Sequence, residues 1–179
     1  MNYEPPGIDT PWSYGIWEGK FIVCFSYTSY GWIQMAIMST VLRQSVVIYC
    51  SDTFDPFPGM QEWLESIANN KFPAEWTINE EGWLRKIRVL RYDDSLVDFQ
   101  IWEESDDNKE AYPPKLILRL RCMRSHVLTE FYNRFTRYVK EDYDPSQWDM
   151  TAQSYDEIWS DLRNIDLANI KAEIDISEN

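Results

Sequence analysis

The chain has 179 residues, of which 44% are hydrophobic and 26% charged, a composition typical of one globular domain with a full core. Its 30 acidic residues outnumber its 17 basic residues, so the net charge is −13. Binding to a nucleic-acid backbone or to an anionic membrane requires a positive face, so this charge argues against both. It favours a basic protein partner, or serves solubility alone.

The first 19 residues combine prolines and glycines with aromatic residues, which predicts an irregular arm. They contain no basic segment followed by an apolar one, so we see no secretory signal and expect a cytoplasmic protein. Beyond the arm, apolar residues alternate with other side chains in the manner of strands. We therefore predict strands over residues 21–27, 32–41 and 46–48.

The clearest helix follows Asp55-Pro56-Phe57-Pro58 and ends at Asn69-Asn70. Apolar residues recur at the spacing i, i+3, i+4, i+7 and i+8 from Met60 onward, which forms a single apolar stripe. Asp55 is placed to cap the first turn. A hairpin is predicted next, with strands over 74–78 and 83–92, and Gly82 supplies a positive φ in its turn.

Two more strands are predicted over 95–102 and 115–122, joined by a polar loop. A second helix begins at Ser125, its expected cap, and runs to about Asp142, and a third spans 155–165. Residues 166–179 are consistent with a helix or a frayed tail. Residues 1–179 therefore form one α+β domain, in which a single mostly antiparallel sheet of about six or seven strands carries two or three helices mainly on one face.

The sequence contains no recognisable catalytic, metal-binding or cofactor-binding motif. His126 is the only histidine, so neither a nucleophilic triad nor a zinc site is expected. The three cysteines lack close spacing, and Cys24 and Cys50 lie in apolar strand patterns, so we expect buried free thiols. We therefore predict a protein that is not an enzyme and needs no cofactor or metal.

The basic residues of the predicted sheet fall on its outer face beside Asp98. We expect these residues to form cross-strand charge pairs, and an anion-binding patch is the alternative. The residues concerned are Lys86, Arg88, Arg119 and Arg121. Acidity is concentrated elsewhere, because residues 1–84 carry a net charge of −7 and residues 141–179 carry −9.

Four stretches follow one another in an order that resembles a known class of proteins: DPFPGMQEWLESIA, PAEWTINEEGW, FYNRF and YDPSQW. They resemble the immunity proteins of bacterial polymorphic-toxin and contact-dependent inhibition loci, over roughly residues 20–148. This class contains many unrelated folds, so the resemblance assigns no residue roles. It implies an inhibitor without enzymatic activity that binds a cognate toxin, often a nuclease with a basic active-site cleft.

The leading hypothesis is an immunity protein that binds a basic toxin and occludes its active site. The aromatic content of 16% and the acidic clusters suit such an interface. One alternative is a phage-type anti-defence protein that mimics nucleic acid with surface carboxylates. Another is an enzyme that uses paired carboxylates in an aromatic pocket. For the leading hypothesis, we predict partner contacts on two acidic segments, through Glu103, Glu104, Asp106, Asp107, Glu110, Asp142, Asp144, Trp148, Asp149, Asp156 and Asp161.

Overall fold

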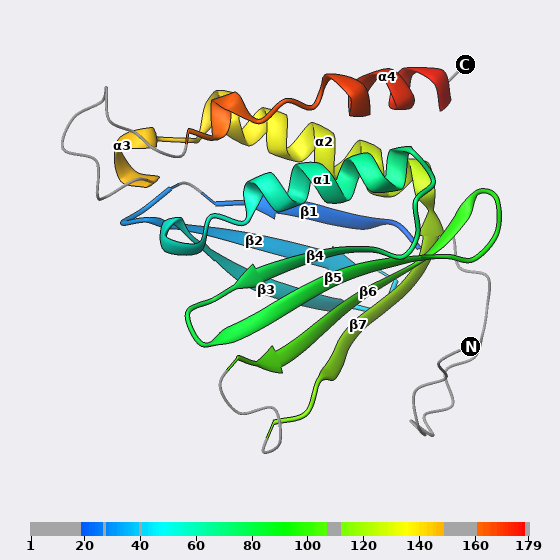
Figure 1. Cartoon of the computed structure of the whole chain (residues 1–179), viewed down its shortest axis with the longest axis horizontal. Helices are drawn as coiled ribbons and strands as arrows, with labels where there is room; N and C mark the ends of the chain where they lie inside the picture. The colour runs from blue at the N-terminus through cyan, green and yellow to red at the C-terminus, as the bar shows by residue number, and fades with distance from the viewer. Residues whose placement is uncertain (1–18, 27, 40, 107–111, 149–160, 178–179) are drawn as a thin grey trace.

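The computed structural model describes residues 19–26, 28–39, 41–106, 112–148 and 161–177 (Figure 1). Within these residues, strands form two antiparallel sheets, one with three strands and one with four. The predicted α+β class is confirmed, and the prediction of a single sheet is wrong. Apart from Gly19, the predicted N-terminal arm lies outside the described residues.

The three-stranded sheet has the order β1 (Phe21–Phe25), β2 (Trp32–Ser39) and β3 (Gln44–Ser51). Alternate residues of each strand are buried, as the sequence pattern predicts. Cys24 falls in the opposite register of β1 and is exposed, so the expected burial of its thiol is wrong. Cys50 is buried, and all three cysteines are free thiols.

The four-stranded sheet has the order β4 (Ala74–Asn79), β5 (Trp83–Arg91), β6 (Leu96–Ser105) and β7 (Lys115–Met123). The tight turn between β4 and β5 contains Gly82 with a φ of +119°, as predicted. The inner face of the sheet is apolar over most of its length.

The chain leaves the first sheet through η1 (Asp52–Phe54) and α1 (Phe57–Ala68) before β4 begins. The last strand of one sheet and the first strand of the other, β3 and β4, are not joined by a hydrogen-bonded ladder. Strand β3 contacts β4 and β7, which are the two edge strands of the larger sheet. Because Phe21 of β1 also stacks on Phe99 of β6, with ring centroids 4.8 Å apart, the inner faces of the two sheets meet in one core.

Helices α1, α2 (Arg124–Glu141) and α4 (Ala168–Ser177) lie together on one side of the sheets (Figure 1). Helix α1 ends before Asn69 as predicted but begins at Phe57, inside the stretch expected to precede it, and the Phe57 N–H donates to the Asp55 carboxylate. The predicted cap at Ser125 is wrong, because α2 starts at Arg124 and its N-cap residue, Met123, makes no side-chain capping bond.

The end of the chain differs in part from the prediction. Residues 155–160 of the predicted third helix lie outside the described residues, and Leu162–Asn164 form the short 3₁₀ helix η3. The C-terminal residues form α4, whose Ile170 and Ile174 side chains are buried. A short helix, α3 (Pro145–Trp148), follows α2.

The outer face of the four-stranded sheet carries cross-strand ion pairs, which confirms the predicted charge pairing for three of the four basic residues; the fourth, Arg121, lies over the Tyr92 ring. The ion pairs join Arg119 to Asp98, Lys86 to Glu104, and Arg88 to Glu75. Asp98 and Gln100 point outward as expected, but the structure leaves each of them less than 8% exposed. They lie on the inner strand β6, where the longer side chains of the flanking strands cover them.

Helix α2 closes the free edge of β1. The Val23 N–H donates to the Glu130 carboxylate at 2.9 Å, and the Phe21 N–H lies 3.2 Å from His126 Nε2. Unpaired N–H groups at a sheet edge need such partners when water cannot reach them. His126 therefore has a structural position at the junction between α2 and β1.

Candidate functional site

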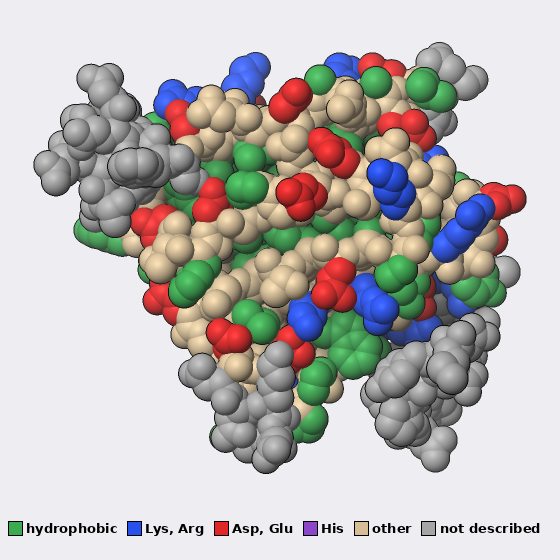
Figure 2. All heavy atoms as spheres, viewed as in Figure 1, with side chains coloured by type: hydrophobic (Ala, Val, Ile, Leu, Met, Phe, Trp, Pro, Cys, Tyr) green, Lys and Arg blue, Asp and Glu red, His purple; other side chains and the backbone are tan. Residues whose placement is uncertain are grey.

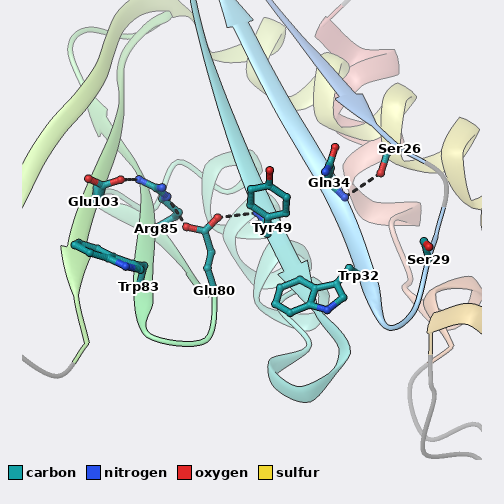
Figure 3. A pocket seen from close by; sticks show the side chains of 9 residues that line it. All are labelled: Ser26, Ser29, Trp32, Gln34, Tyr49, Glu80, Trp83, Arg85 and Glu103. Atoms are coloured by element: carbon teal, nitrogen blue, oxygen red, sulfur yellow. Dashed lines mark hydrogen bonds and ion pairs between the residues drawn. The ribbon is translucent and has the colours of Figure 1, made fainter.

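A groove of about 770 Å³ lies where the two sheets meet at one end of the molecule (Figure 3). One wall is the outer face of the three-stranded sheet together with the β1–β2 connection. Trp32, Gln34 and Tyr49 alternate with buried neighbours and so point away from the core into this wall. Ser26 and Ser29 complete this side of the groove.

The other wall continues the inner face of the four-stranded sheet. Trp83 and Arg85 share a face of β5 with the buried residues Ile87 and Val89. Glu103 is two residues beyond the buried Ile101 on β6, and it lies opposite Arg85 in the strand register. The core face of this sheet therefore changes from apolar to charged where it enters the groove.

A chain of polar contacts crosses the groove (Figure 3). Arg85 lies between two carboxylates, donating from Nη1 to Glu103 and from Nε to Glu80. The other oxygen of Glu80 accepts the Tyr49 backbone N–H at 2.7 Å. These contacts join β6, β5 and the β4–β5 turn to the edge strand of the other sheet.

The hypothesis of an enzyme with paired carboxylates requires two acids that face each other across a pocket. In the groove Arg85 separates the two acids, and each of them bonds to its guanidinium. A guanidinium held in this way is a fixed positive charge with two acidic partners. The arrangement is suited to rigid electrostatic recognition.

Beside the groove, five segments of the chain are connected by hydrogen bonds, and we call them together the loop end. They are the β1–β2 turn (28–31), η1, the β4–β5 turn (80–82), Asp106, and residues 144–148 with α3. The bonds run from Asp144 N to Thr28 Oγ1, Gly31 N to Gln147 O, Asp52 N to Gly31 O, and Asp106 N to Gly82 O, and Ser51 at the N-cap of η1 donates from Oγ to Glu81.

The loop end is acidic. It contains no Lys or Arg, and its acids come from all of its segments except the β1–β2 turn: Asp52, Glu80, Glu81, Asp106 and Asp144. A shallow depression of about 360 Å³ lies between η1, the β4–β5 turn and Asp106. Tyr30 and Phe54 expose 75% and 47% of their surface here, so aromatic side chains accompany the carboxylates.

The structure brings three of the predicted contact residues to this part of the molecule. Glu103 lines the groove, and Asp106 and Asp144 belong to the loop end with exposed side chains. Asp142 is exposed at the C-terminal cap of α2, two residues before the loop end. Both predicted acidic segments thus contribute to one end of the molecule.

Other predicted contact residues have different surroundings. Glu104 is only 5% exposed and pairs with Lys86 on the outer sheet face. Trp148 is fully buried, with its ring 5.7 Å from that of Phe57, so it belongs to the core and not to a contact surface. Asp161 binds Arg163, which holds the pKa of its carboxyl below the usual range. Asp107, Glu110, Asp149 and Asp156 lie outside the described residues.

Sequence reasoning missed Glu80, Trp83 and Arg85 as site residues. The register of β5 contained a usable signal, because Trp83 and Arg85 fall on the same face as Ile87 and Val89. A charged residue in the inward register of a strand marks a position where the apolar core ends. Tyr49 carried no comparable signal, since an outward-facing tyrosine is common in strands.

Comparisons of the chain with protein-family models, curated protein sequences and solved structures found no match. Within the described ranges, no group of three or more His, Cys, Asp and Glu residues is arranged to hold a metal ion. Among the helices described, none combines the length and apolar character needed to cross a membrane.

Proposed function

We propose that the protein is an inhibitor of the immunity-protein type, which binds a basic protein partner through its loop end and occludes that partner's active site. A toxin domain with a basic cleft, such as a nuclease, is the expected partner. The resemblance of residues 20–148 to immunity proteins motivates the class of function. The composition of the loop end supports the choice of binding surface.

The observation that carries the proposal is the joining of acids from separate chain segments into one surface, to which the described residues of the loop end contribute no Lys or Arg. Glu81, Asp106 and Asp144 are exposed there. In Figure 2 the carboxylates at the left edge, over η1 and the β4–β5 turn, have no described Lys or Arg side chain drawn beside them. Such a surface attracts a basic partner over long range and accelerates association.

The exposed aromatic residues of the loop end supply contact area to the same surface. Tyr30 and Phe54 lie on the β1–β2 turn and on η1, beside the acids. Aromatic residues dominate the energetics of protein interfaces, and the charges around them set orientation and rate. The acids of the loop end come from separate turns, whereas mimicry of a nucleic-acid backbone would require two rows of carboxylates at phosphate-like spacing.

The experiment is co-purification of the tagged full chain from its source cells, followed by growth and binding assays with the captured protein. We expect a protein rich in Lys and Arg that arrests growth when expressed alone and is neutralised by co-expression of this chain. The double variant E81K/D106K should slow association about tenfold at low salt, and the effect should shrink as salt rises.

The matched control is D94K/D175K, which makes the same change in net charge at two exposed positions outside the loop end. It should change the association rate much less than E81K/D106K does. Equal rates for the two double variants would refute the loop end as the binding surface. A captured partner that is acidic, or that does not impair growth, would refute the proposed function.

A further inference from the structure

The groove beside the loop end holds an unbalanced charge. Its lining contains the carboxylates of Glu80 and Glu103 and one guanidinium, that of Arg85, so it carries one negative charge in excess. Glu80 is fully engaged, since one oxygen binds Arg85 and the other accepts the Tyr49 N–H. One further cation would make the lining neutral.

The excess charge is most accessible at Glu103. Its side chain is 30% exposed, compared with 7% for Glu80. Only its Oε2 atom bonds to Arg85, and the second oxygen points away from that residue (Figure 3). Glu103 therefore offers an open carboxylate oxygen on a side chain that Arg85 already holds in place.

Two exposed aromatic side chains line the groove, Trp83 on the side of Glu103 and Tyr49 beyond Arg85 and Glu80 (Figure 3). Trp83 exposes 41% and Tyr49 exposes 45% of its surface. The Trp83 ring is packed edge to face against Tyr112 at 5.7 Å, which fixes its orientation. The negative faces of indole and phenol rings attract cations, and arginine is the cationic side chain most often found in such cation–π contacts.

The same chain contains an example of this chemistry on its other sheet face. The guanidinium carbon of Arg121 lies 3.4 Å from the centre of the Tyr92 ring. An arginine side chain should bind at such a site more tightly than a lysine side chain. Its planar guanidinium stacks on a ring while donating to a carboxylate, and it is more weakly hydrated than an ammonium group.

We infer that the groove receives an arginine side chain of the basic partner, which pairs with the open oxygen of Glu103 and lies against Trp83. This inference rests on the proposed function, because it names the group that a partner bound at the loop end inserts. Glu80 and Ser29 belong to both the groove and the loop end, so the two surfaces are continuous. Arg85 and Glu80 are the support that keeps Glu103 in position.

The test uses N-acetyl-arginine-N-methylamide as the probe and its neutral isostere, the citrulline amide, as the matched ligand. Both are titrated into the ¹⁵N-labelled full chain, and the indole N–H signals are followed by NMR. We expect the arginine probe to shift the Trp83 signal with an affinity about tenfold higher than that of the citrulline probe. E103Q should weaken arginine binding about fivefold to tenfold, and E62Q should leave it unchanged.

W83L keeps the carboxylate and removes one aromatic surface at an exposed position, so it decides the outcome should E103Q fail to fold. It should weaken the arginine probe by a factor of about 3–5. Equal shifts for arginine and citrulline, equal binding by E103Q and wild type, or shifts caused only by a neutral sugar such as maltose would each overturn the inference.

The two proposals fail in different ways. The arginine probe could bind in a Glu103-dependent way while co-purification captures no basic protein. That result would uphold the groove as an arginine site and refute the inhibitor function. A partner whose binding depends on Glu81 and Asp106 but is unchanged by E103Q and W83L would uphold the function and refute the inference.

Discussion

The Glu80 carboxylate accepts the backbone N–H of Tyr49 at 2.7 Å, and this bond fastens the β4–β5 turn of one sheet to the edge strand of the other. The second oxygen of Glu80 holds Arg85. One side chain thus connects the two sheets and supports the charged wall of the groove. The stability of the fold and the shape of the site therefore depend on the same residue.

Two substitutions of Glu80 should separate the contribution of its bond to the Tyr49 N–H from that of its ion pair with Arg85. E80A removes the acceptor of the Tyr49 N–H and one partner of Arg85, so we expect a loss of about 1–2 kcal/mol in the free energy of unfolding. E80Q keeps an acceptor oxygen and should lose less. Urea denaturation followed by tryptophan fluorescence measures both. E62A, at an exposed position of α1, is the control, and a loss of equal size there would contradict the assignment.

Alkaline pH should weaken the contact between α2 and the loop end. The hydroxyls of Tyr138 and Thr28 lie 2.6 Å apart, and burial raises the pKa of Tyr138 above its usual value. Burial also raises the pKa of Tyr143 to about 12. A tyrosine with a raised folded pKa contributes stability that is complete below pH ~10 and is lost as the pH rises through the folded pKa.

Y138F tests this dependence. The variant should be about 1 kcal/mol less stable than the wild type at pH 8, because the hydrogen bond to Thr28 is lost. Its stability should then fall less steeply between pH 9 and 11.5, since one buried ionisable group is gone. Denaturant titrations at each pH provide the measurement. Parallel curves for the two proteins would rule out Tyr138 as a source of the alkaline loss.

The three thiols should differ in reactivity. Cys24 is exposed, whereas Cys50 and Cys122 are buried, and burial raises the pKa of both buried thiols, that of Cys122 to about 12. Since the thiolate is the reactive form, a disulfide reagent at pH 8 should modify Cys24 first. C24S should lose the fast phase. A second fast thiol in C24S would contradict the burial of the other two.

Phe131 is the centre of the aromatic core. Its ring is fully buried and lies 4.9 Å from that of Trp63 and 6.2 Å from that of Trp76. F131A should cost about 3–5 kcal/mol in unfolding free energy, because it removes the ring and leaves a cavity. F131L should cost about 1–1.5 kcal/mol. N133A, at an exposed position of the same helix, should stay within about 0.5 kcal/mol of the wild type.

Alternation of apolar residues was enough to predict the strands and the faces they bury. Ile33, Met35 and Ile37 are buried as their spacing requires. The same pattern could not predict the division into two sheets, because alternation specifies which face of a strand is buried and not which strand lies beside it. The division falls between β3 and β4, where the chain passes through η1 and α1.

The candidate site was less predictable than the fold. Glu103, Asp106 and Asp144 could be proposed from acidity alone, whereas Glu80 depends on a contact with Tyr49 across 31 positions of sequence. Trp148 lies in the polar stretch YDPSQW and was expected at the surface. It is buried because α3 folds back against Phe57, a tertiary contact that local composition does not report.

The closed edge of β1 limits how another protein can bind. His126 and Glu130 occupy positions beside the backbone of Phe21 and Val23 that a further strand would need. An extended peptide cannot extend the three-stranded sheet at β1 unless α2 first moves away from that edge. Strand addition at β1 is therefore excluded as long as α2 stays in this position.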